Sequence, residues 1–214
     1  MQAKEINEFF RRLAKERPEP KTELNYVNDY TLVVAVVLSA QATDSGVNRA
    51  TESLFKKVTT PKQMLKLGEA GLKNHIKTIG LYNGKAKNIM ALSKILVDQF
   101  DGQIPRSRDE LQSLPGVGRK TANVVLNVAY GERTMAVDTH VFRVSNRTGL
   151  AKGKNPEEVE EGLLKVIPDQ WMKHAHHWLI LHGRYTCKAR MPLCPACVVR
   201  DLCAFQDKTP SPTK

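Results

Sequence analysis

The sequence lacks any apolar run long enough to cross a membrane. Its longest, Leu32–Leu38, has seven residues, whereas a spanning helix needs about 20. Met1–Pro20 is a charged amphipathic stretch without the apolar segment of a signal peptide. We therefore expect a soluble protein of a reducing compartment, the cytoplasm, with no membrane partner.

Cysteine is absent from the first 186 residues. Because the only cysteines are Cys187, Cys194, Cys197 and Cys203, nothing elsewhere in the chain can pair with them. Disulfides are rare in a reducing compartment. Four clustered thiols suit either a structural zinc ion or an iron–sulfur cluster, and their chemistry alone does not separate the two.

Convincing strand patterns are also missing. Thr31–Ala40 is apolar nearly all round, which a buried strand and a buried helix have in common. No second strand is available to pair with it, and an isolated strand would leave its backbone groups without partners. We therefore expect a central buried helix in an all-α fold. Other helices are expected at Ile6–Lys15, Ser45–Val58, Lys62–Lys66, Ala70–Thr78, Lys85–Phe100, Ser107–Leu114, 119–130, His140–Arg147, Asn155–Val166 and Ala175–His182.

What the chain has in excess is positive charge, with a formal net charge of +11. Residues 1–132 contain 20 basic and 14 acidic side chains, and residues 133–214 contain 13 and 8. A merely soluble basic protein could have this composition. The spread over both halves favours a nucleic acid lying across both.

The most informative stretch is 114–122, LPGVGRKTA. Pro115 stops the incoming helix, because its ring nitrogen has no N–H and crowds the preceding residue. Gly116 and Gly118 permit positive φ and a close approach from outside. The turn should therefore present amide N–H groups at a helix N-terminus, which suits a phosphate. A plain helix–helix corner explains the glycines equally well, but Lys120 beside the turn favours the phosphate site.

Residues 114–126 (LPGVGRKTANVVL), residues 136–144 (AVDTHVFRV) and the cysteine spacing resemble the helix-hairpin-helix DNA glycosylases, and within them the endonuclease III family. The resemblance runs from about Thr22 to Cys203. It implies a six-helix domain at 21–132 that contains the hairpin. A second domain would combine 1–20 with 133–214, carry a [4Fe–4S] cluster on the four cysteines, and end in a partly disordered tail within 203–214.

The resemblance also implies an activity and its residues. The family removes oxidised pyrimidines and then nicks the abasic site by β-elimination through a lysine Schiff base. Lys120 would be the nucleophile, made neutral by burial and by the positive end of its helix. Asp138 would stabilise the sugar cation and accept a proton, in a cleft between the domains. The alternative roles are a phosphate contact for Lys120 and a helix N-cap for Asp138.

Double-stranded DNA with damaged bases or abasic sites is the implied partner of a monomer, placed on the nucleoid if the source is a bacterium. Gln41 and Leu81 would replace the extruded base in the stack. The alternative for Gln41 is a plain helix end, with Thr43 or Asp44 capping the next helix. The alternative for Leu81 is an anchor that packs its loop against the protein. The remaining DNA contacts would come from the hairpin and the basic cysteine loop: Gly116, Val117, Gly118, Arg119, Lys188, Arg190 and Arg200.

The cysteine spacing matches the family's [4Fe–4S] loop at all four positions. We expect the cluster to stiffen this loop and take no part in the chemistry, because the lyase reaction needs no electron. The histidines near the last helix lack the pattern of a catalytic zinc site, so metal binding is not predicted for His174, His176, His177 or His182.

Two other functions fit parts of the sequence. An adenine-mismatch glycosylase of the same superfamily has the hairpin, the aspartate and the cluster, but it lacks the lysine and carries a further C-terminal domain. Lys120, and an end eleven residues after Cys203, argue against it. A non-enzymatic helix-hairpin-helix DNA-binding module would need neither Lys120, Asp138 nor the cysteines.

Overall fold

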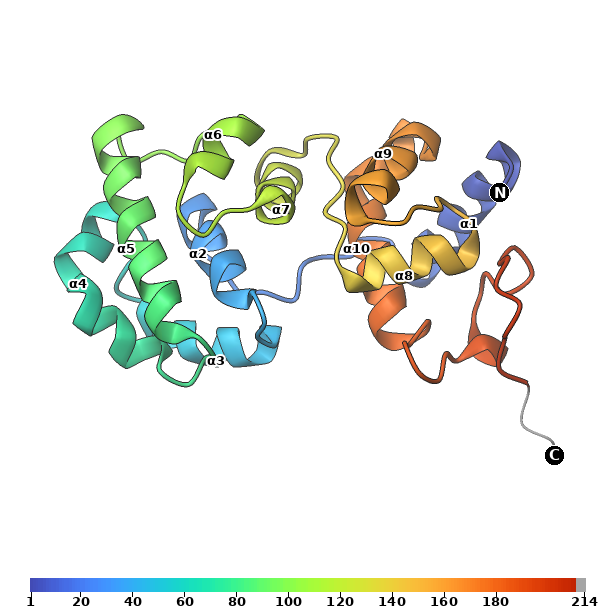
Figure 1. The fold of residues 1–214 in the computed structure, drawn as a ribbon, viewed down its shortest axis with the longest axis horizontal. Helices are drawn as coiled ribbons and strands as arrows, with labels where there is room; N and C mark the ends of the chain where they lie inside the picture. Colours follow the sequence, from blue (N-terminus) through green and yellow to red (C-terminus); the bar gives the residue numbers. More distant parts are fainter. Residues whose placement is uncertain (211–214) are drawn as a thin grey trace. The chain divides into compact units, whose positions relative to one another are not determined.

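The structure is a computed structural model in which residues 1–210 are described. Over these residues the chain forms ten α-helices and one 3₁₀ turn, with no β-strand (Figure 1), which confirms the all-α prediction. None of the helices in this range has the length and apolar character to cross a membrane. The chain divides into two compact units, Thr22–Glu132 and Met1–Lys21 with Arg133–Lys214.

The unit Thr22–Glu132 is built around one buried helix, α2 (Asp29–Ser39), in which every residue from Tyr30 to Leu38 is buried. It packs against three neighbours, and Tyr30 Oη lies 2.7 Å from Ser93 Oγ of α5 in the interior. The expectation of a helix here is confirmed. The other helices of this unit are α3 (Asp44–Phe55), α4 (Pro61–Ile76), α5 (Tyr82–Gln99), α6 (Arg108–Ser113) and α7 (Arg119–Tyr130).

Two local features explain helix boundaries that the sequence predicts. Asn28 caps α2 by accepting the N–H of Thr31 at 3.0 Å, so the helix begins before the apolar run does. Inside α4, Gly68 has φ +76° and interrupts the helical backbone. The two short helices predicted on either side of Gly68 are therefore the two arms of one kinked element.

The unit Met1–Lys21 with Arg133–Lys214 contains α1 (Ala3–Glu16), α8 (Thr139–Thr148), α9 (Pro156–Val166), α10 (Asp169–Tyr185) and the 3₁₀ turn Cys194–Ala196. Helix α10 packs against α1 and α8. Phe9 and Phe10 of α1 are fully buried, and the Phe10 ring centroid lies 6.1 Å from that of Trp178. Residues from both ends of the sequence therefore form one core.

Candidate functional site

The hairpin between α6 and α7 has the predicted construction. Helix α6 ends at Ser113, before Pro115, and α7 begins at Arg119. Gly116 has φ +82°, whereas Gly118 has φ −88° and is extended. Only Gly116 therefore needs glycine for its backbone conformation. At Gly118 an added Cβ would meet nothing within 4 Å, so this glycine leaves open space in front of the α7 N-terminus.

Lys120 is the second residue of α7 and its side chain is exposed. Burial within the protein therefore does not account for a neutral amine here, because the first residues of α7 are exposed. Arg119 beside it is also exposed. Val117 is buried, and its N–H already donates to Leu114 O at 3.0 Å. The side chain of Val117 therefore packs the hairpin, and a contact of Val117 with DNA stays a prediction.

Asp138 caps α8 and retains a free oxygen. The N–H groups of His140 and Val141 donate to Asp138 Oδ1 at 2.9 and 2.8 Å. Both bonds end on the same oxygen, so the cap leaves Oδ2 for another role. Asp138 lies in one unit and Lys120 in the other. Their meeting in a cleft stays a prediction.

Gln41 and Leu81 share an unusual backbone conformation. Their φ values are +53° and +60°, in the left-handed region that side chains rarely occupy. Both side chains are exposed, and Leu81 is 67% exposed, so neither residue packs a loop against the core. Thr43 caps α3, as the plainer reading of the segment after α2 expects. Both positions therefore combine a strained backbone with an exposed side chain.

The four cysteines line one hollow, called here the four-cysteine hollow, together with apolar Pro192, Leu193 and Phe205. Burial raises the pKa of Cys197 to about 11 and raises that of Cys203. The described residues contain no group of three or more His, Cys, Asp or Glu placed to hold one metal ion.

Two arginines of α8, Arg143 and Arg147, donate hydrogen bonds to the cysteine loop beside this hollow. Arg147 Nη1 donates to Cys187 Sγ at 3.7 Å, and its two Nη atoms donate to the carbonyls of Lys188 and Ala189 at 2.7 and 2.8 Å. Arg143 Nε donates to Cys187 O at 3.0 Å. Four thiols facing one hollow, with a guanidinium beside a sulfur, fit an anionic cluster held by thiolates.

Two further residues, Arg12 and Thr209, hold the loop, and no sequence pattern predicts the contacts of either. Arg12 of α1 donates to Asp201 Oδ1 and Oδ2 at 2.6 and 3.0 Å and to Val198 O at 2.9 Å. Thr209 Oγ1 donates to Pro192 O at 2.6 Å and accepts the Cys194 N–H at 3.2 Å. Thr209 therefore has defined contacts within the tail 203–214 that is predicted to be partly disordered, and residues 211–214 lie outside the described residues.

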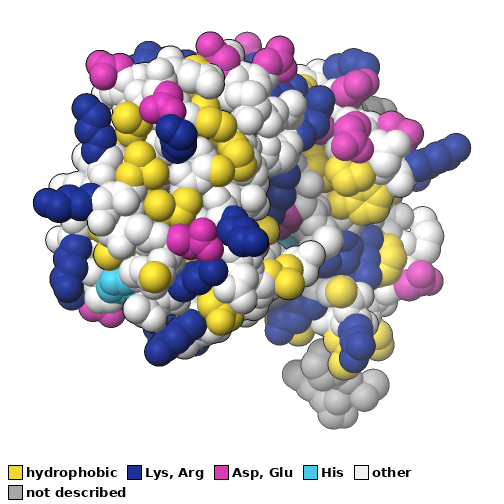
Figure 2. Space-filling view, turned by 60° about the vertical axis from the view of Figure 1, so that its left-hand side comes forward, with side chains coloured by type: hydrophobic (Ala, Val, Ile, Leu, Met, Phe, Trp, Pro, Cys, Tyr) yellow, Lys and Arg dark blue, Asp and Glu magenta, His cyan; other side chains and the backbone are white. Residues whose placement is uncertain are grey.

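The predicted DNA contacts of the cysteine loop, Lys188, Arg190 and Arg200, are all exposed. Figure 2 shows one face of the molecule, on which Lys and Arg side chains are spread over much of the surface. Asp and Glu gather mainly along its upper edge. The surface charge therefore agrees with the net charge of +11 and suits a polyanion.

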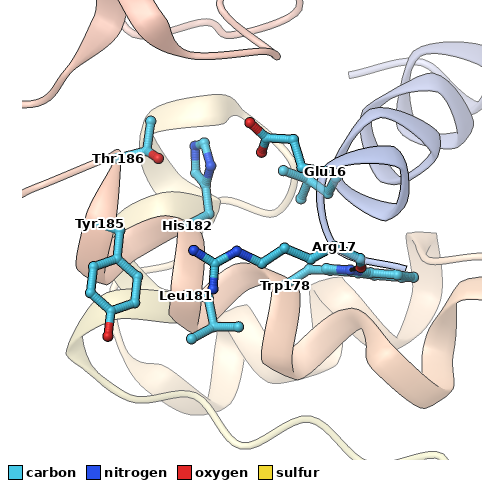
Figure 3. A pocket seen from close by; sticks show the side chains of 8 residues that line it. Glu16, Arg17, Trp178, Leu181, His182, Tyr185 and Thr186 are labelled. Carbon is cyan, nitrogen blue, oxygen red and sulfur yellow. Dashed lines mark hydrogen bonds between the residues drawn. The ribbon is translucent and has the colours of Figure 1, made fainter. Parts of the chain in front are cut away.

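Three of the four histidines of α10, His176, His177 and His182, are buried. Burial lowers the pKa of His177 and of His182 to about 4. His182 also lies beside a second cavity, called here the α1–α10 pocket, of about 290 Å³. Figure 3 shows the side chains that line it, with the Arg17 guanidinium extending towards Tyr185. The lining residues are Leu13, Glu16, Arg17, Trp178, Leu181, His182, Tyr185 and Thr186.

Known proteins with the same construction were found by sequence and by structure. Residues 34–169 match the family model of the HhH-GPD superfamily base excision DNA repair proteins. Endonuclease III of Rickettsia conorii is 60% identical over 96% of this chain and 98% of its own length. Endonuclease III of Escherichia coli K12 is 56% identical over 94% and 95%. A trapped endonuclease III–DNA covalent intermediate, an estranged-adenine complex, superposes with a TM-score of 0.88 at 46% identity, covering 95% of this chain and 96% of that one.

Proposed function

The chain belongs to the endonuclease III family of the HhH-GPD superfamily, and from this membership we propose that it removes oxidised pyrimidines from double-stranded DNA and nicks the resulting abasic site. It is a bifunctional base-excision repair DNA glycosylase/lyase, and relatives named endonuclease III match it over nearly the full chain. The observation that carries the lyase half is Lys120, at the second position of α7 beside the hairpin.

In the proposed reaction, the neutral amine of Lys120 attacks C1′ of the damaged nucleotide. The C1′–N bond breaks, and its electron pair leaves with the base, which is then protonated. Nitrogen loses a proton, and its electron pair then forms the C1′=N double bond of the Schiff base as the C1′–O4′ bond breaks and O4′ takes up a proton, which opens the sugar ring. A proton is then removed from C2′ and the 3′ phosphate leaves, which cuts the strand. The exposed position of Lys120 supports this role because the nucleophile must reach a nucleotide outside the protein.

Asp138 acts in this reaction as the fixed anion. As the base departs, positive charge develops on the sugar, and a carboxylate held in place stabilises it without reorganising. Two backbone bonds to Oδ1 orient the group, and Oδ2 stays available for the sugar or for a proton from Lys120. The cap and the catalytic role therefore coexist in one side chain.

Leu81 and Gln41 extrude the damaged nucleotide. Leu81 is an apolar wedge at the start of α5, and Gln41 can hydrogen-bond the base left without a partner. The positive φ and the exposed side chain at both positions support this role. The basic side chains of the hairpin and the cysteine loop contact phosphates of the DNA; these are Arg119, Lys188, Arg190 and Arg200. If the source is a bacterium, the protein acts on DNA in the nucleoid.

A [4Fe–4S] cluster, held by Cys187, Cys194, Cys197 and Cys203, stabilises the cysteine loop. The fit of the four-cysteine hollow to an anionic group supports it. The purified protein should contain about four irons per chain and absorb in the visible region. Stoichiometric zinc in protein prepared without oxygen would contradict this assignment.

Lys120→Gln tests the proposed reaction. The variant should bind lesion-containing duplex but lose strand cleavage and borohydride cross-linking, because the Schiff base cannot form. Arg119→Gln is the matched control, since it removes the neighbouring exposed charge. It should weaken binding and still cross-link at saturating protein. Cross-linking of Lys120→Gln at the wild-type yield would place the nucleophile elsewhere.

A further inference from the structure

His182 stands between the four-cysteine hollow and the α1–α10 pocket, and its imidazole lines both. Its Nε2 lies 3.7 Å from Cys197 Sγ, within hydrogen-bonding range for sulfur. Cys197 is one of the two cysteines whose pKa is clearly raised by burial. One aromatic ring therefore separates this buried sulfur from a pocket of about 290 Å³.

The direction of the hydrogen bond follows from the chemistry of a metal ligand. A cysteine that binds iron does so as the thiolate, which has no proton to donate. The contact with His182 must then run from the imidazole N–H to sulfur, which selects the tautomer protonated at Nε2. A donor bonded to a ligating sulfur withdraws electron density from it. It therefore stabilises the more negative, reduced form of a cluster over the oxidised form.

We propose that His182 is a positioning residue for the cluster, which donates a hydrogen bond from Nε2 to the Cys197 thiolate and thereby raises the cluster's reduction potential. This inference rests on the proposed cluster. It goes beyond a merely structural role for the cluster, because a side chain of α10 then influences the reduction potential of the cluster.

Packing fixes the ring at this place. His182 is 6% exposed, and the N–H groups of Thr186 and Cys187 both donate to its carbonyl, at 3.0 and 2.7 Å. The end of α10 and the start of the cysteine loop are therefore both hydrogen-bonded to the backbone of this residue. The N–H of Cys187, the first cysteine, donates to the carbonyl of His182, and the side chain of His182 faces Cys197, the third cysteine.

The test compares reduction potentials, measured by voltammetry on DNA-free protein with its cluster loaded. His182→Phe keeps a ring and removes the donor, so its potential should shift to a more negative value than that of wild type. In His182→Gln the side-chain amide can donate to the same sulfur, so the potential should return towards the wild-type value. His177→Phe is the matched control: it removes a buried histidine of the same helix with a similarly lowered pKa. Its potential should not move.

Each result supports or overturns the inference. Equal potentials in wild type, His182→Phe and His182→Gln would overturn it while leaving the cluster itself in place. Wild-type protein without iron would overturn the cluster proposal and this inference together. Should His182→Phe fail to load iron, pulsed EPR of wild type labelled with ¹⁵N-histidine decides. Coupling of one ring nitrogen to the cluster, lost in His182→Gln, supports the bond, and its absence in wild type overturns it.

Discussion

Asn88 of α5 occupies the space in front of Gly116 in the hairpin. A β-carbon on Gly116 would lie 3.0 Å from both Cβ and Nδ2 of Asn88, closer than such atoms normally approach. The glycine also has φ +82°, where a side chain is strained whatever the space. The hairpin is therefore held against α5 by a contact that only glycine permits.

Gly116→Ala should lower the free energy of unfolding by about 1–3 kcal/mol, because it combines a left-handed backbone with a steric contact. Gly118→Ala is the matched control. Its φ of −88° suits alanine and its surroundings are open, so the stability should change little. Chemical denaturation measures both. Equal loss in the two variants would show that the Asn88 contact does not matter.

Asp138→Asn should keep the fold and slow the chemistry on the order of a hundredfold, as loss of one fixed electrostatic group does. Asparagine caps a helix about as well as aspartate, so the free energy of unfolding should hardly change. Asp138→Ala removes the cap as well and should cost a further ~1 kcal/mol of stability. Single-turnover rates separate the two roles, and a normal rate for Asp138→Asn would reduce Asp138 to a cap.

The residues that the sequence predicts well are those with local causes. Pro115 and Gly131 end helices through their own backbone chemistry, and α2 could be assigned because it had no strand to pair with. The contacts of Arg12 with Asp201 and of His182 with Cys197 have no such local sign. They join elements that meet only after folding. The exposure of Lys120 could not be predicted, because the sequence of a helix N-terminus does not show whether that end faces the core or the solvent.

Leu81→Ala should slow excision most for a damaged base that is still well paired, and least for an abasic site, which has no base to extrude. Extrusion costs a few kcal/mol, so removal of the Leu81 side chain should slow excision more where more base pairing must be broken. Gln41→Ala should change the tolerance for the opposite base more than the maximal rate. Single-turnover rates on both substrates in one duplex measure this. Equal slowing by Leu81→Ala on the two would point to general binding instead.

Arg190→Ala and Arg200→Ala should each flatten the salt dependence of DNA binding by about 0.9 in the logarithmic slope, as loss of one phosphate contact predicts. Arg11→Ala is the control, because this exposed arginine on α1 is already paired with Glu8 at 2.6 Å. Its slope should match wild type. Unchanged slopes in both loop variants would remove the cysteine loop from the DNA interface.

Thr209→Val should speed the loss of cluster absorbance in the presence of an iron chelator by up to about thirtyfold, because two hydrogen bonds worth roughly 1 kcal/mol each are lost. Valine has nearly the same shape, so the fold itself should stay intact. Thr209→Ser retains the hydroxyl and should behave as wild type. If all three proteins lose the cluster at one rate, the contacts with Pro192 and Cys194 do not retain it.

The division of the chain has a consequence for the order in which the molecule assembles. Helix α1 leaves the ribosome before the rest of its unit, but the core that covers Phe9 and Phe10 is made largely of residues from Met135 onward. The segment Thr22–Glu132 is contiguous and can complete its fold in the meantime. The apolar face of α1 therefore remains uncovered throughout that interval, so nascent-chain chaperones should bind this protein at its first helix.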